Sequence, residues 1–294
     1  MLPPFAGEVP QSGDGGYQSI DKTAAGGYNI PMIKLIASDL DGTLFPPHKG
    51  LPDETFELIE KLYDKGIIFT PASGRQLPNL LKLFEPVKDK IAVIAENGGI
   101  VWHSGEIIYS NPTPAQAVKR TLDAVKEVEG LHPLLSCADC AYYESGNPHF
   151  MEVVKKSYSC CKRVESLEDI LDGITVIKIS IWDENPPCAD HGGPLLAPLL
   201  KGLRTIVSGY DWLDVSTLGA NKGNALKELM IRLNVTPDEC EAYGDHMNDF
   251  EMLSVCGHPY VTANAFAGLK VHFKNELPSN ADMGVIKRLK ELLK

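Results

Sequence analysis

The sequence predicts an α/β protein that has a parallel sheet, helices on both faces of that sheet and a second, inserted domain. From residue 32 onward, short apolar segments alternate with amphipathic segments, which is the pattern of βαβ units. The stretch from 112 to 210 changes character, with helical patterns and scattered short strands. At 294 residues the chain exceeds the usual size of one hydrophobic core, so two domains are expected.

Residues 1–30 are rich in Gly, Pro, Ser and Asp and show little periodicity. This composition favours a flexible N-terminal extension without a catalytic role. The core domain is predicted at 31–111 and 211–294, and the inserted domain at 112–210. The elements expected before the insertion are a strand at 33–38, a helix at 53–65, a strand at 67–70, a helix at 77–84, a strand at 91–95 and a hairpin at 99–109.

The insertion begins at 112, within the turn signal at 111–114, where two prolines follow an asparagine. Its longest strand signal is the run at 174–182, in which alternation predicts one covered face and one open face. The core then resumes with a helical pattern at 224–233, a strand-like segment at 240–243 and an amphipathic helix at 282–293.

The end of the first strand, at 39–43, carries the strongest chemical signal. Side chains alternate along a strand, so Asp39 and Asp41 leave on the same side. Two carboxylates that lie so near each other need a cation or a shared proton. Gly42 permits a sharp turn, and Thr43 offers a hydroxyl and a backbone N–H to an oxyanion. This arrangement suits a phosphate held by a divalent ion.

Two simpler interpretations compete for this segment. Asp-Gly pairs are common turn formers, and a plain turn would explain the pair alone. A calcium loop that started at Asp39 would need an acidic or amide group at its fifth position and glycine at its sixth. Those positions hold Thr43 and Leu44, so the calcium loop is excluded.

A second acidic cluster at 244–249 contains Asp245, Asn248 and Asp249, and it follows the strand-like segment at 240–243. Ligands of an open parallel sheet bind beyond the carboxyl ends of its strands, so the two clusters can converge on one metal. Further polar groups at strand ends or helix starts are Ser73, Gly74, Arg75 and Lys222. Taken singly, Ser73 would more often be a helix cap and Lys222 a solvated surface charge.

Composition narrows the class of partner. The net charge of −11 argues against nucleic acid, because that affinity rests on basic patches. Phosphate must therefore be held by local cations such as Mg²⁺, Lys222 and Arg75. No segment approaches the roughly 18 apolar residues of a membrane span, and residues 1–5 lack the pattern of a secretory signal. A cytoplasmic protein is expected, without a membrane partner and as a monomer or weak homo-oligomer.

The seven cysteines do not have the arrangement of a disulfide framework and are expected to be reduced. Cys137 and Cys140 have the spacing of a zinc knuckle. The adjacent Cys160 and Cys161 fit a second knuckle poorly. Packing as small apolar groups is the favoured interpretation of these thiols.

The ordered set of motifs resembles the haloacid dehalogenase superfamily of phosphohydrolases, and within it the Cof-type, sugar-phosphatase-like branch. The resemblance covers about residues 32–294. The matching segments are 39–43 for the first motif, Ser73 within 72–75 for the second, Lys222 for the third and 244–249 for the fourth. Further similar signatures lie at 97–99, 263–265 and 279–285.

This resemblance implies a Rossmann-like core with an inserted α/β cap that selects the substrate. It also implies a Mg²⁺-dependent phosphatase acting on small phosphomonoesters such as sugar phosphates. Asp39 would attack phosphorus and form an aspartyl-phosphate. Asp41 would protonate the leaving group and then activate water.

The resemblance assigns the remaining candidates to metal and phosphate binding. Asp39, the Asp41 backbone carbonyl, Asp245 and Asp249 are the expected metal residues, with Asp249 and Asn248 orienting the shell rather than binding directly. The expected phosphate or substrate residues are Thr43, Ser73, Gly74, Arg75, Asn97, Lys222 and Asn248. The alternatives are a sugar phosphomutase on the same scaffold and a catalytically idle protein that binds a phosphorylated metabolite.

Overall fold

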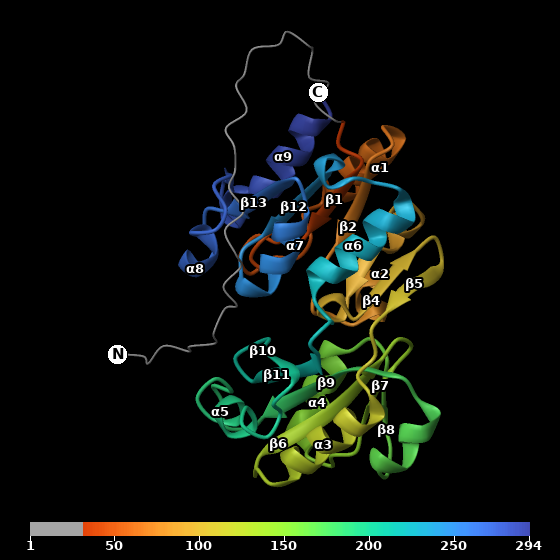
Figure 1. Ribbon diagram of the computed structural model, residues 1–294, viewed down its shortest axis with the longest axis vertical. Coiled ribbons are helices and arrows are strands. Elements are labelled where there is room, and N and C mark those ends of the chain that lie inside the picture. Colours follow the sequence, from red (N-terminus) through yellow and green to blue (C-terminus); the bar gives the residue numbers. More distant parts are fainter. Residues whose placement is uncertain (1–31) are drawn as a thin grey trace, which may run out of the picture. The chain divides into compact units, whose positions relative to one another are not determined.

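The computed structural model describes residues 32–294 (Figure 1), and the predicted extension at 1–30 lies outside this range. The core is an α/β layer built on a five-stranded parallel sheet in the order β14-β13-β12-β1-β2. Its strands are β1 (Leu35–Ser38), β2 (Ile68–Pro71), β12 (Cys240–Gly244), β13 (His258–Thr262) and β14 (Glu276–Leu277). The predicted parallel sheet is confirmed.

Helices cover both faces of this sheet because successive strand residues point to opposite sides. In β1, Ile36 packs with α1, α2 and α9, whereas Leu35 and Ala37 pack with α6, α7 and α8. The helices of the core are α1 (Thr55–Asp64), α2 (Leu77–Leu83), α6 (Lys222–Leu233), α7 (Phe250–Val255), α8 (Ala267–Lys270) and α9 (Gly284–Leu292). The strands and helices predicted for the core are present, with bounds shifted by a residue or two.

A three-stranded antiparallel sheet continues the core beyond β2. It consists of β3 (Ala92–Ala95), β4 (Ile100–His103) and β5 (Glu106–Ser110). Two parallel bridges, Phe69 to Ile91 and Ala72 to Ile94, join it to the β2 side. The β4–β5 pair is the hairpin expected from the sequence.

The inserted segment forms a separate six-stranded sheet in the order β10-β11-β9-β6-β7-β8. All its pairs are antiparallel except β7 with β8. Its strands are β6 (Leu131–Cys137), β7 (Ala141–Tyr143), β8 (Cys161–Arg163), β9 (Val176–Asp183), β10 (Leu203–Val207) and β11 (Trp212–Thr217). Its helices are α3 (Ala115–Lys126), α4 (Pro148–Ser157) and α5 (Gly192–Leu196).

Strand β11 pairs with both β9 and β10, so this sheet continues past residue 210. We therefore propose that the inserted domain, called the cap below, ends at Thr217. The expectation of one open face on its longest strand is wrong, because every residue of β9 is buried. Ile179 and Ile181 enter the cap core; on the opposite face, Trp182 packs on α4 and Lys178 reaches the Gly74 carbonyl of the core domain.

The structure also corrects the prediction that all cysteines are reduced. Cys140, just before β7, forms a disulfide with Cys160, just before β8. These two short strands are hydrogen-bonded neighbours, so the cysteines face each other although 20 residues separate them. The other five cysteines are free thiols, and Cys137 is buried apart from the bond. No described helix has the length and apolar character needed to cross a bilayer.

Candidate active site

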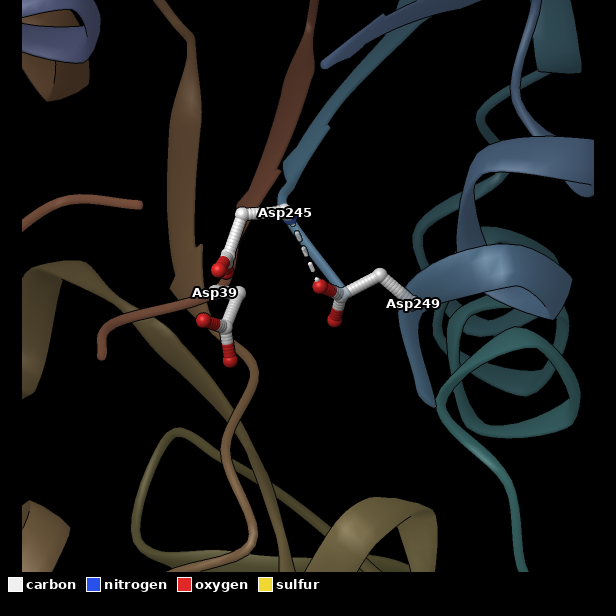
Figure 2. Close-up of side chains that lie close together, drawn as sticks. All are labelled: Asp39, Asp245 and Asp249. Carbon is white, nitrogen blue, oxygen red and sulfur yellow. Dashed lines mark hydrogen bonds between the residues drawn. The ribbon is translucent and has the colours of Figure 1, made fainter. Parts of the chain in front are cut away.

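The two acidic clusters meet at the carboxyl edge of the parallel sheet. Asp39 follows β1 and Asp245 follows β12, and these two strands are paired up to Ser38 and Tyr243. The Asp39 N–H continues the ladder by donating to the Tyr243 carbonyl at 2.9 Å. One oxygen each from Asp39, Asp245 and Asp249 lies within 4.8 Å of the others (Figure 2). Neighbouring parallel strands therefore bring together residues that are about two hundred positions apart.

Lys222 supplies a cation at the centre of this cluster. It is the first residue of α6 and is completely buried, so it is not the solvated surface charge that its residue type favours. Its Nζ donates to Asp39 Oδ1 at 2.5 Å and to Asp249 Oδ1 at 2.7 Å. Three carboxylates against one ammonium leave two negative charges, which is the charge that a divalent cation balances.

The remaining contacts distinguish the carboxylates. Asp249 Oδ2 accepts hydrogen bonds from the backbone N–H groups of Asp245 and His246, at 3.0 and 3.2 Å. Both Asp249 oxygens are therefore engaged within the chain. Asp245 Oδ1 accepts from the Thr43 hydroxyl at 2.8 Å. Within residues 32–294, no hydrogen bond reaches Asp39 Oδ2 or Asp245 Oδ2, so these two oxygens are available to a ligand.

The pKa values of the crowded carboxylates Asp39 and Asp245 are raised. Burial raises the pKa of Asp39 well above its usual value; Lys222 opposes this shift, and the charges of Asp249 and Asp245 add to it. Burial is also the main cause that raises the pKa of Asp245, and Asp249 adds to it. The ionised site is therefore short of positive charge. Carboxylate oxygens are the ligands that Mg²⁺ prefers, so the residues present fit that ion.

Asp41 lies apart from the buried cluster. Its carboxylate is exposed and accepts two hydrogen bonds from Arg75, from Nε at 3.0 Å and from Nη2 at 2.7 Å. The Arg75 guanidinium also lies 5.2 Å from the centre of the Phe45 ring. The predicted acid and the predicted substrate-binding cation are thus paired with each other in this structure.

The turn at Ser73, Gly74 and Arg75 lies between β2 and α2. The Arg75 N–H donates to Ser73 Oγ at 3.3 Å, so the hydroxyl closes the turn. Asn97 lies against it: a Cβ added to Gly74 would stand 2.9 Å from Asn97 Nδ2. Asn97 Oδ1 in turn accepts from Asn248 Nδ2 at 3.4 Å. The four expected substrate residues Ser73, Gly74, Asn97 and Asn248 are therefore neighbours.

A strained turn holds Asn97 in place. Glu96, Asn97 and Gly98 all have positive φ, at 53°, 54° and 93°, a conformation that side chains other than glycine rarely adopt. A Cβ on Gly98 would overlap the carbonyl of Asn221, the residue before Lys222. Close approach of this turn to the start of α6 thus requires glycine and helps to place the lysine.

A cavity of about 450 Å³ opens beside these residues, which is within the size range of small-molecule sites. Its core-domain wall includes Asp39, Asp41, Ser73, Gly74, Arg75, Gln76 and Asn79. Its cap wall is formed by Lys156, Ser157, Tyr158, Lys178, Ser208, Trp212 and Asp214. The sequence reasoning did not identify any residue of the cap wall. The available signal was Lys178, a charged residue with apolar neighbours on both sides in β9.

A family model described as haloacid dehalogenase-like hydrolase matches residues 36–289. A relative in Escherichia coli, named 5-amino-6-(5-phospho-D-ribitylamino)uracil phosphatase YbjI, is 26% identical and aligns over 89% of this chain and 97% of its own. The HMP-PP phosphatase of Cronobacter sakazakii is 27% identical over 81% of this chain and 87% of its own.

Solved structures give the same result. A crystal structure from Eubacterium rectale has a TM-score of 0.77 and 30% identity, and the match covers 88% of this chain and 99% of that one. A haloacid dehalogenase-like hydrolase from Bacillus subtilis, at 22% identity, shares the fold with a TM-score of 0.76. The chain therefore belongs to the haloacid dehalogenase-like hydrolase family, in its Cof-type branch, and is a phosphoric monoester hydrolase.

Proposed function

We propose that this enzyme is a Mg²⁺-dependent phosphatase that hydrolyses small phosphomonoesters, such as sugar phosphates, through an aspartyl-phosphate. The observation that carries the proposal is the position of Asp39. This buried carboxylate lines a cavity, Lys222 holds one of its oxygens, and no hydrogen bond from residues 32–294 reaches the other. Two relatives are named as phosphatases of small phosphorylated metabolites, which supports the same substrate class.

In the proposed first step, Asp39 Oδ2 attacks phosphorus and forms the acyl-phosphate bond while the ester P–O bond breaks. Lys222 holds the nucleophile by its other oxygen and offsets the charge of the phosphoryl group. Ser73 contributes a hydroxyl to the phosphoryl oxygens. The leaving alkoxide takes a proton from Asp41. In the second step, water attacks phosphorus and gives a proton to Asp41, the bond between phosphorus and Asp39 Oδ2 breaks, and phosphate leaves with the Asp39 carboxylate restored.

Arg75 gives this scheme a specific requirement. Its two hydrogen bonds to Asp41 must open before that carboxyl group can exchange a proton with the substrate. Phosphoryl oxygens are good bidentate partners for a guanidinium. We therefore propose that Arg75 exchanges Asp41 for the substrate phosphate, which releases the acid for its role.

Asp39, Asp245 and the backbone carbonyl of Asp41 would hold Mg²⁺, which would supply positive charge to the phosphoryl oxygens. For Asp249 we propose a supporting role in place of direct coordination, because its oxygens already bind Lys222 and two backbone N–H groups. Its contacts fix the loop that carries Asp245.

The test is phosphate release with and without Mg²⁺ from a panel of hexose phosphates, pyridoxal phosphate and an aryl phosphate. Asp39→Asn keeps the shape of the side chain and should abolish release, whereas Asp89→Asn, on the surface, should leave it unchanged. Full activity of Asp39→Asn would contradict the covalent mechanism. Transfer of the phosphoryl group to a second sugar without phosphate release would show a mutase.

A further inference from the structure

Lys178 connects the cap to the core at the edge of the cavity. It lies in cap strand β9 and is 4% exposed. Its Nζ donates to the Gly74 carbonyl at 2.9 Å and to Asp214 Oδ2 at 3.0 Å. Glu96 Oε2 lies 3.0 Å from the same nitrogen in an ion pair. One buried ammonium therefore contacts cap strand β11 and two separate turns of the core.

These neighbours keep Lys178 protonated and bind its ammonium group. Burial alone would lower the pKa of Lys178, but the carboxylates of Asp214 and Glu96 raise it above its ordinary value. An ammonium has three protons, and three protein oxygens lie within 3.0 Å of this one. Although Lys178 lines the cavity, its two hydrogen bonds and its ion pair with Glu96 are all made to the protein.

The carboxylates that hold Lys178 are themselves fixed. Glu96 Oε1 accepts from the Ser136 hydroxyl of β6 at 2.7 Å. Asp214 Oδ1 accepts from the Ser180 hydroxyl at 2.7 Å. Because each carboxylate has a second partner, the position of Nζ follows the position of the cap sheet.

The contact with Gly74 is the one that reaches the proposed phosphate site. The carbonyls of Ser73 and Arg75 accept hydrogen bonds from the backbone N–H groups of Asn97 and Glu96, at 3.0 and 3.1 Å. The carbonyl of Gly74, between them, is bound by Lys178. The core backbone thus fixes both ends of the turn, and the cap fixes its middle.

The orientation of this peptide decides where the Ser73 hydroxyl points. The Gly74 carbonyl and the Arg75 N–H belong to one planar trans peptide, so they point in opposite directions. A lysine that fixes the carbonyl also directs the N–H, and this N–H donates to Ser73 Oγ. With its oxygen accepting that bond, the hydroxyl can direct its own proton toward a phosphoryl oxygen.

We propose that Lys178 is a positioning residue. Through its hydrogen bond to the Gly74 carbonyl it holds the turn 73–75 in its phosphate-binding orientation. That orientation therefore depends on the position of the cap against the core domain. The proposal rests on the proposed function, because it assumes that this turn receives the phosphoryl group. It assigns a role in phosphate affinity to a residue whose contacts are with the protein.

The test compares Lys178→Met with Thr113→Val. Thr113 donates its hydroxyl to the Ile177 carbonyl at 2.8 Å, so its loss removes a buried hydrogen bond to the same strand without touching the turn. The first measurement is the Kd of inorganic phosphate by calorimetry in Mg²⁺, which requires no turnover. The second is kcat/KM for acetyl phosphate, whose small leaving group reports on the phosphoryl site rather than on the cap wall.

We expect Lys178→Met to weaken phosphate binding and to lower kcat/KM for acetyl phosphate at least tenfold each, which corresponds to about 1.4 kcal/mol. Thr113→Val should lower the melting temperature while keeping both values within twofold. If both values stay within twofold in Lys178→Met, or if only larger substrates lose activity, the proposal is wrong. If the wild type releases no phosphate, the proposed function fails, and the phosphate Kd still decides the role of Lys178.

Lys178→Met leaves two buried carboxylates without their cation and can fail to fold. A second pair avoids this problem: Asp214→Asn and the double variant Lys178→Met/Asp214→Asn, which keeps the net charge of the wild-type trio. Phosphate should bind at least tenfold more weakly to the double variant than to Asp214→Asn. Equal affinity would overturn the proposal.

Discussion

Replacing Lys222 with methionine should be costly for both stability and activity. Methionine keeps an unbranched side chain but removes the charge from a completely buried position. Asp39 and Asp249, whose oxygens lie 2.5 and 2.7 Å from Nζ, would then face each other with Asp245 nearby. Breaking a buried ion pair costs about 3–5 kcal/mol, because the remaining charge has no partner. At about 2–4 °C per kcal/mol, the melting temperature should fall by roughly 10 °C.

The assay is thermal unfolding followed by circular dichroism in EDTA, with phosphate release measured separately in Mg²⁺. Lys227→Met is the matched control because it changes an exposed lysine of the same helix, and it should be nearly neutral. The double variant Lys222→Met/Asp249→Asn restores the net charge of the site and should recover part of the lost stability. Activity of Lys222→Met should fall about 10²-fold or more. Equal melting temperatures for Lys222→Met and Lys227→Met would refute this account of the charge balance.

Three further outcomes are expected. Asp245→Ala should raise the Mg²⁺ concentration needed for half-maximal phosphate release, and an unchanged requirement would remove it from the metal ligands. Gly98→Ala places a Cβ on the Asn221 carbonyl at a φ of 93°. Its free energy of unfolding, measured by urea denaturation, should therefore fall by more than about 1 kcal/mol. An unchanged free energy of unfolding would contradict the close approach. Burial raises the pKa of Cys137 to about 12, so at pH 8 an aromatic disulfide reagent should label the half-buried Cys161 first. Labelling of Cys137 should then speed up about tenfold per pH unit as its thiolate fraction rises, and fast labelling at pH 8 would show that it is not buried.

Features that depend on local sequence were predictable. A buried strand followed at once by aspartate places that carboxylate at the sheet edge, which is why the positions of Asp39 and Asp245 could be anticipated. Their catalytic and metal-binding roles stay predictions, as do those of the phosphate residues.

Features that depend on how distant segments meet were not predictable. The Lys178 contact with Gly74 requires the register between two domains, which no periodicity encodes. The Cys140–Cys160 bond arises because β7 and β8 pair, and the spacing of cysteines does not reveal that pairing. The cap end that we propose at Thr217 could not be placed from the sequence, because the β11 sequence is typical of any strand. The pairing of Asp41 with Arg75 depends on the reach of a long arginine side chain.

The order in which the sheet is completed has a consequence for biosynthesis. Strand β1 leaves the ribosome early, but its neighbour β12 and the lysine that balances Asp39 follow only after the whole cap; 183 positions separate Asp39 from Lys222, and 202 separate Thr43 from Asp245. Contacts this distant in sequence form late in folding. A nascent chain that has released Asp39 and the cap, but not residues 222–249, lacks Lys222, Asp245 and Asp249 beside that carboxylate. Under the proposed function, phosphatase activity would therefore begin only when this last part of the core has been made.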